Sequence, residues 1–213
     1  MPDHDRLRWE ELASISEFAH TLSDEQWDHD SLCDGWRVRD VISHMTLGYT
    51  TPAFKMIGML AHYRFNVPKG SKEGSVAYGS AHTPEEILAV FDTIPKEHVR
   101  KGIARVIKSS ESMLDHVVHH QDMRRPLGMP RQVPEDRLVA ALDVAPGLGG
   151  FVDSKTRAAG LRLRATDVEW SHGDGPEVSG TGEAILLALT GRKVVLDELS
   201  GEGVATLRER LSA

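Results

Sequence analysis

The residues most able to do chemistry lie together in the segment DHVVHHQD, residues 115–122. This segment is predicted to be helical, and side chains four residues apart on a helix project from the same face. Asp115 and His119 form one such pair, and His116 and His120 form a second pair on a neighbouring stripe. Two imidazole or carboxylate groups at this spacing can ligate one metal ion. The periodicity alone does not choose between the two pairs.

Two ligands rarely make a tight metal site, so a metal centre needs a third ligand from elsewhere in the chain. The best candidate is His44, at the edge of the apolar stripe of another predicted helix. A structural interpretation competes with this one. A histidine beside an apolar stripe is most often a hydrogen-bonded, half-buried side chain, and an Asp–His pair on a helix is most often a surface pair worth a few tenths of a kcal/mol. On spacing alone the structural interpretation is the commoner one.

The chain contains 11 histidines but a single cysteine, Cys33. One thiol excludes a disulfide framework within the chain and any Cys-x-x-Cys site. Cys33 comes just before a turn, close to Trp36, and is expected to be a packed residue rather than a nucleophile. A Gly-x-Ser-x-Gly motif is absent, which leaves a serine hydrolase with little support. Arg124 and Arg125 follow the histidine-rich segment, where they can hold a carboxylate substrate or a cofactor, or simply interact favourably with the helix dipole.

Composition limits the function further. The chain has 213 residues, with 25 Lys and Arg against 32 Asp and Glu, a formal charge of −7, and 40% apolar residues, which is enough for a sizeable core. The acidic balance argues against nucleic-acid binding, which needs clustered basic residues. Apolar stretches such as Ala184–Leu189 are too short to span a membrane, and the opening MPDHDR does not resemble an export signal. We therefore expect a cytoplasmic protein that binds neither nucleic acid nor membrane.

Hydrophobic periodicity and capping signals predict that the first two thirds of the chain are helical. Residues 67–82, rich in Gly, Ser and Lys, are instead expected to be a mobile connection. The helix over residues 102–125 is expected to carry Ile103 and Val106 on its apolar face, away from both histidine pairs. The predicted helices cover residues 5–22, 37–50, 52–65, 83 onward with Thr83 as N-cap and a break at Pro95, 102–125, a short stretch from 134, and part of 147–158.

After Gly160 the pattern changes to an alternation of period two, which predicts strands over residues 161–165 and part of 167–171. Residues 172–176 contain Gly-Asp-Gly-Pro without the Gly-Lys-Ser/Thr of a phosphate loop, and are expected to form a hairpin turn. Two helices, over residues 182–190 and 203–211, close the chain. A few long helices with short loops favour a bundle. The expected fold is mainly α, with a helical bundle over residues 1–145 and a small α+β subdomain over 146–213.

Two longer blocks of sequence carry a resemblance to a known family. Residues 32–44, LCDGWRVRDVISH, resemble the signature LCDGWTVRDVVAH of the mycothiol-dependent maleylpyruvate isomerase family, within the DinB-like metalloprotein superfamily. Residues 115–128, DHVVHHQDMRRPLG, are similar to that family's block E-x3-H-G-Q-D-x-R-R-P-L-G. A weaker match to the family's tail region follows at residues 170–176, 191–192 and 199–204. The blocks occur in the family's order.

The resemblance implies a DinB-like four-helix bundle with a divalent metal near one end. The family's ligand positions fall on His44, Asp115 and His119, with Asp115 where Glu is usual and His120 where Gly is common. The aspartate reaches about one methylene less far, which weakens, shifts or abolishes metal binding unless another group, such as His120, compensates. Two imidazoles and a carboxylate suit zinc and leave a coordination position open. Mycothiol is the implied thiol cofactor.

The resemblance therefore implies a mycothiol-using isomerase or thiol transferase that acts on a small electrophilic substrate, as a monomer or homodimer. A competing hypothesis is a non-catalytic DinB-like bundle that serves as a metal-binding or stress-response protein, and the aspartate at position 115 keeps this hypothesis open. Metal-dependent hydrolysis by a bound hydroxide would use the same ligands without a thiol. The sequence does not choose the substrate or the metal.

Overall fold

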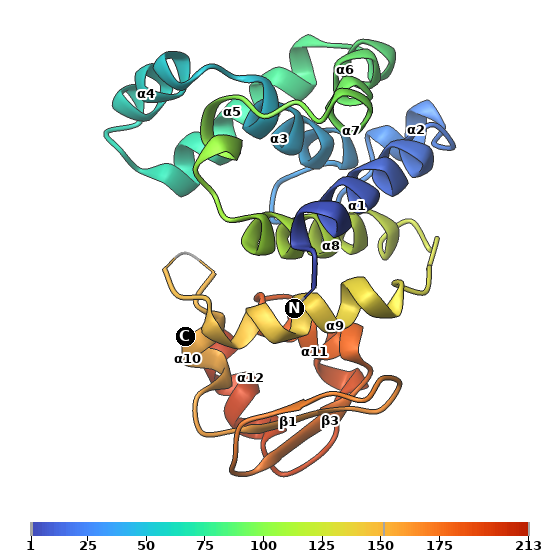
Figure 1. Ribbon diagram of the computed structural model, residues 1–213, viewed down its shortest axis with the longest axis vertical. Helices are drawn as coiled ribbons and strands as arrows, with labels where there is room; N and C mark the ends of the chain where they lie inside the picture. The colour runs from blue at the N-terminus through green and yellow to red at the C-terminus, as the bar shows by residue number, and fades with distance from the viewer. Residues whose placement is uncertain (1, 151, 213) are drawn as a thin grey trace. The chain divides into compact units, whose positions relative to one another are not determined.

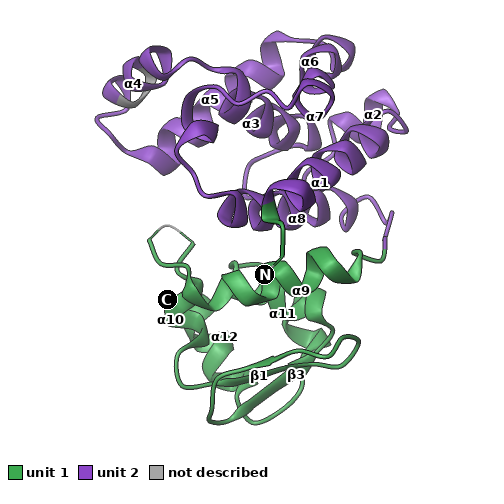
Figure 2. Ribbon diagram, viewed as in Figure 1, with its two compact units in different colours: residues 1–4, 132–213 green, residues 5–131 purple. Residues whose placement is uncertain are grey.

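The computed structural model describes residues 2–150 and 152–212, and it divides into two compact units. One unit is Asp5–Arg131 and the other combines Met1–His4 with Gln132–Ala213 (Figure 2). The described residues are mostly helical with one small sheet, which confirms the predicted fold class.

The unit Asp5–Arg131 is all-helical (Figure 1). Its four longest helices are α1, α3, α5 and α8, and α3 packs against both α5 and α8. The core is formed by apolar side chains that recur at helical spacing, such as Leu12, Ile15 and Phe18 of α1 and Val41, Ile42 and Met45 of α3. The elements are α1 (His4–Ala19), α2 (Asp24–Trp27), α3 (Val38–Thr50), α4 (Ala53–His62), α5 (Val67–Ala81), α6 (Pro84–Phe91), α7 (Thr93–Glu97), the 3-10 helix η1 (Gly102–Arg105) and α8 (Ser109–Arg124).

The expectation of a mobile connection over residues 67–82 is wrong, because these residues form α5. Asn66 caps this helix by accepting a hydrogen bond from the backbone N–H of Lys69, and a proline lies in its first turn. The small residues serve packing rather than flexibility. A Cβ added to Gly79 would lie 2.4 Å from Asp40 Oδ1, so only glycine allows α5 to approach α3 this closely. Composition alone cannot separate these two uses of glycine.

The single helix expected over residues 102–125 is divided into η1 and α8. Ile103 and Val106 are exposed by 36% and 79%, so neither belongs to the apolar face that we expected. Contacts with the end of α3 explain the break. Lys101 N–H donates to the Tyr49 carbonyl, and a Cβ on Gly102 would lie 2.0 Å from the carbonyl oxygen of Thr51, the C-cap of α3. The backbone at residues 101–102 therefore packs against the end of α3 and does not continue as one helix into α8.

The second unit contains a three-stranded sheet with the order β2-β1-β3. Strand β1 pairs antiparallel with β2 and parallel with β3, with Leu163 opposite His172 and Val178 respectively. Its elements are α9 (Glu135–Val144), η2 (Ala145–Gly147), α10 (Ser154–Ala158), β1 (Arg162–Ala165), β2 (Ser171–His172), β3 (Glu177–Gly180), α11 (Gly182–Leu189), η3 (Lys193–Glu198) and α12 (Val204–Ser212).

Residues 172–176 are not the hairpin turn that we expected, because β2 and β3 lie on opposite sides of β1. The loop instead crosses the start of β1. Gly173 and Gly175 have φ of 73° and 129°, and a Cβ on either would lie within 2.4 Å of a carbonyl oxygen of Leu161 or Gly160. These glycines are needed for the crossing.

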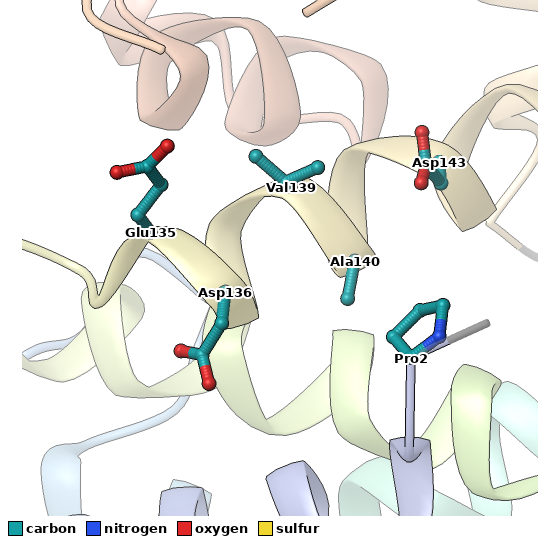
Figure 3. A pocket seen from close by; sticks show the side chains of 6 residues that line it. All are labelled: Pro2, Glu135, Asp136, Val139, Ala140 and Asp143. Carbon is teal, nitrogen blue, oxygen red and sulfur yellow. The ribbon is translucent and has the colours of Figure 1, made fainter. Parts of the chain in front are cut away.

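Helix α9 belongs to the C-terminal unit, so the division falls earlier than the expected boundary after residue 145. Gly182 of α11 packs closely against Leu138 and Leu142 of α9, and Trp170 Nε1–H donates to Asp143 Oδ1 at 2.9 Å. This unit has a pocket of about 510 Å³ on α9, lined by Pro2, Glu135, Asp136, Val139, Ala140 and Asp143 (Figure 3). None of these lining residues was predicted to be functional.

Candidate metal centre

Helix α8 brings together the first two predicted ligands. Asp115 and His119 are one turn apart on α8, and the distance from His119 Nε2 to Asp115 Oδ1 is 3.4 Å. His119 is buried, whereas 45% of the Asp115 side chain is exposed. The pair therefore lies at the edge of the bundle core, with its carboxylate accessible from solvent.

Helix α3 supplies the third predicted ligand, His44. Its ring centroid lies 5.2 Å from that of His119, at an interplanar angle of 73°. One ligand atom from each of His44, Asp115 and His119 lies within 4.8 Å of the other two. The structure thus gathers all three residues, although α3 and α8 are far apart in the sequence.

The electrostatics of His44 suit a metal ligand. Burial, together with the charge of the nearby His119, lowers the pKa of His44 to about 4. At neutral pH its imidazole is therefore uncharged and has a lone pair to donate. Ser71 Oγ of α5 lies 3.1 Å from His44 Nδ1, which orients the ring and leaves Nε2 as the candidate ligand atom.

The donor set fits a divalent cation. Tetrahedral ligands at 2.0–2.2 Å from a zinc ion are about 3.4 Å from one another, and the distance between His119 Nε2 and Asp115 Oδ1 is 3.4 Å. The aspartate is therefore long enough to share a cation with His119. Three protein ligands, of which the Asp115 carboxylate is partly exposed, leave room for a water or an external ligand at a fourth position.

The second nitrogen of His119 faces two residues that the sequence did not single out as functional. His119 Nδ1 lies 2.9 Å from Asp122 Oδ2, and Cys33 Sγ lies 3.1 Å from that oxygen and 3.7 Å from the nitrogen. Burial opposes protonation, but the charge and hydrogen bond of Asp115, together with the hydrogen bond to Asp122, hold the pKa of His119 well above its usual range. The sequence signal that could have predicted the contact between His119 and Asp122 is their spacing of three residues on one helix.

The signature segment around Cys33 is attached to α8 beside this contact. Leu32 N–H donates to the Asp122 carbonyl at 3.0 Å, and Trp36 N–H donates to the Cys33 carbonyl at 2.9 Å. The Trp36 ring packs 5.1 Å from the ring of His44 and 6.1 Å from that of His119. The LCDGW segment therefore packs against both histidines through Trp36 and is joined to α8 through Leu32.

The second predicted pair, His116 and His120, faces other partners. His116 Nε2 lies 2.9 Å from the Tyr49 hydroxyl, and its Nδ1 lies 3.5 Å from Asp115 Oδ2. His120 is fully buried, and its Nδ1 lies 2.8 Å from Glu11 Oε1. Both ring nitrogens of His120 are occupied within the core, so it does not supply the compensating ligand considered from the sequence.

Arg124 lies in the cluster around His120 rather than with the three candidate ligands. Its Nε–H donates to His120 Nε2 at 2.8 Å, and its guanidinium lies 4.1 Å from the centroid of the Phe18 ring. Since Arg124 can only donate, His120 must carry its proton on Nδ1 and donate it to Glu11. Arg125 ends α8 as its C-cap. The cofactor-binding role expected for these two arginines stays a prediction.

Comparison with known proteins places this geometry in context. Residues 8–100 match the family model of the mycothiol maleylpyruvate isomerase N-terminal domain, a range that includes His44 and the LCDGW segment. This match confirms the predicted resemblance to the family. Asp115 and His119 lie beyond the matched residues. No curated protein sequence matches the chain.

Solved structures from this family have the same fold. A crystal structure of a mycothiol-dependent maleylpyruvate isomerase superposes with a TM-score of 0.60 at 16% identity, over 95% of this chain and 93% of the other. A mutant of such an isomerase, in which a histidine is replaced by alanine, gives a TM-score of 0.58 at 15% identity, over 95% of this chain and 93% of the other.

Among the described residues, no helix combines the length and apolar character needed to cross a membrane.

Proposed function

We propose that the protein is a metal-dependent enzyme that uses mycothiol to isomerise a small electrophilic substrate or to transfer the thiol to it. The observation that carries this proposal is the meeting of His44, Asp115 and His119 within 4.8 Å. The match to the mycothiol maleylpyruvate isomerase N-terminal domain supports mycothiol as the thiol.

His44, Asp115 and His119 are the proposed ligands, and zinc is the proposed metal because two imidazoles and a carboxylate suit it. A divalent metal supplies Lewis acidity, which lowers the pKa of a thiol so that it ionises near neutral pH. Ser71 holds His44 through Nδ1. The exposed side of Asp115 gives an external thiol and a substrate their access.

The thiol must come from outside the chain in this proposal. Cys33 is the only cysteine, and its Sγ is hydrogen-bonded to buried Asp122. In isomerisation, a thiolate adds to a conjugated cis double bond, rotation follows about the resulting single bond, and elimination returns the thiolate and the trans product. In transfer, the carbanion formed by the addition takes a proton from water instead of eliminating the thiolate, so the new carbon–sulfur bond is kept and the adduct leaves.

Metal analysis of the purified protein tests the centre. We expect about one equivalent of zinc in the wild type and none in the double variant His44→Ala/His119→Ala. The matched control is His20→Ala, since His20 is an exposed histidine paired with Asp92. Full metal occupancy in the double variant would show that the ligand assignment is wrong.

A second candidate function is a non-catalytic metal-binding protein of the same fold. Asp115, where the family has Glu, favours it. Calorimetric titration of the zinc-loaded protein with mycothiol separates the two functions. Saturable binding that is lost in the double variant supports the enzyme, and the absence of saturable binding supports the non-catalytic protein.

A further inference from the structure

Asp122 and Cys33 lie on the far side of His119 from the proposed ligands. Asp122 is fully buried on α8, three residues after His119. One of its oxygens, Oδ2, lies 2.9 Å from His119 Nδ1 and 3.1 Å from Cys33 Sγ. Two groups therefore converge on a single carboxylate oxygen that solvent does not reach.

The chemistry of this contact fixes the protonation of His119. An ionised carboxylate only accepts hydrogen bonds, so His119 must carry a proton on Nδ1 and donate it to Asp122. In the neutral ring, the lone pair is then on Nε2, the nitrogen that lies 3.4 Å from Asp115 Oδ1. Histidines that ligate metals commonly donate their other N–H to a carboxylate in this way.

Cys33 and its neighbours hold Asp122 in place. The Cys33 thiol donates to the same oxygen, and Leu32 N–H donates to the Asp122 backbone carbonyl at 3.0 Å. The signature segment thus contacts Asp122 through both backbone and side chain. These contacts restrict the carboxylate to the orientation in which it accepts from His119.

We propose that Asp122, supported by Cys33, is a positioning residue that directs His119 Nε2 toward the metal. This inference rests on the proposed function. The three residues Cys33, His119 and Asp122 also form a cluster whose ligand atoms lie within 4.8 Å of one another. The Asp122 carboxylate is fully buried, whereas 45% of the Asp115 side chain is exposed, so we place the metal at Asp115, where the carboxylate is open to solvent.

Zinc affinity, measured by competition with a chromophoric chelator, tests the role of Asp122. Loss of such a carboxylate partner typically costs 10–100-fold in metal affinity. We expect a loss of this size for Asp122→Ala and a smaller one for Asp122→Asn, whose amide oxygen still accepts but carries no charge. Cys33→Ser keeps a donor at this position and should retain the wild-type affinity.

Glu11→Gln is the matched control, because Glu11 is the other fully buried carboxylate that pairs with a histidine of α8. It should lower stability without changing zinc affinity. Nitrogen-15 NMR of the zinc-loaded wild type gives a second readout, in which His119 should be protonated at Nδ1 and metal-bound at Nε2. If Asp122 only stabilised the fold, the Asp122 variants and Glu11→Gln would lose stability alike, and zinc affinity would not fall in the Asp122 variants alone.

Two results would overturn the inference. The first is zinc affinity in Asp122→Ala and Asp122→Asn equal to that of Glu11→Gln. The second is a thiolate-to-metal charge-transfer band in the cobalt-loaded protein that disappears in Cys33→Ser, because Cys33 would then be a ligand.

His44→Ala separates this inference from the proposed function. If zinc binding is lost in His44→Ala but unchanged in the Asp122 variants, only the positioning role is removed. Zinc binding that survives in His44→Ala removes the proposed centre itself.

Discussion

Three histidines within one stretch of α8 have three different environments, and residues of other helices determine each one. His119 meets His44 of α3, His116 meets Tyr49 of α3, and His120 meets Glu11 of α1. Spacing along α8 placed Asp115 and His119 on one face but did not show which face would meet another ligand. The partners come from distant segments, so the choice between the two pairs required either the resemblance or the structure.

His120 makes stability depend on pH. Burial, together with the charges of Arg131 and Arg124, lowers its pKa from 6.5 to about 4, despite its hydrogen bond to Glu11. Between these two values the unfolded chain binds a proton that the folded chain does not, so folding weakens as the pH falls. From about pH 7.5 to about pH 5 this contribution amounts to about 2 kcal/mol.

Urea unfolding at the two pH values measures this effect. The free energy of unfolding of the wild type should fall by about 2 kcal/mol more than that of His120→Gln, because glutamine does not titrate. An identical pH dependence in the wild type and His120→Gln would contradict the prediction.

At the scale of helices, the close approach of α3 and α5 depends on Gly79. A Cβ at this position would lie 2.4 Å from Asp40 Oδ1 and 3.2 Å from Ser43 Oγ, both in α3. Asp40 is buried and accepts a hydrogen bond from Arg37 N–H at the start of α3, so it has little freedom to move. Overpacking of this kind typically costs 1–3 kcal/mol.

We therefore expect Gly79→Ala to lower the free energy of unfolding by up to about 2 kcal/mol, because the gain of about 1 kcal/mol in helix propensity offsets part of the overpacking cost. Gly58→Ala is the matched control, since Gly58 lies in α4 with no atom within 4 Å of an added Cβ. That variant should be slightly stabilised. Denaturant unfolding of both variants checks the difference, and equal effects at the two glycines would show that α3 and α5 do not require glycine at their contact.

The elements that the sequence predicted well are those whose signals are local. Thr83 and Pro84 predicted the start of α6, and the structure has the capping box there. The elements that it missed depend on distant contacts: α5 uses small residues to approach α3, and Gly102 follows the end of α3 instead of continuing a helix. The same holds at the site, where Cys33 looked like packing because its partner, Asp122, is far away in the sequence.

At the scale of the whole molecule, the proposed metal ligands belong to one of the two units. His44, Asp115 and His119 all lie within Asp5–Arg131, on α3 and α8. A cation shared by these helices joins two segments that are distant along the chain, and it binds the folded state only. Metal binding should therefore stabilise this unit and have no direct effect on the sheet of the other unit.

Hydrogen exchange with and without zinc tests this expectation. Zinc at about 100 times its dissociation constant adds about 2.7 kcal/mol to the stability of the state that binds it. Amide exchange in α3 and α8 should slow accordingly, while exchange in β1 and β3 keeps its metal-free rate. His44→Ala should show no zinc-dependent change in either unit. Zinc protection that extends to β1 and β3, or that persists in His44→Ala, would mean that the metal binds elsewhere in the chain.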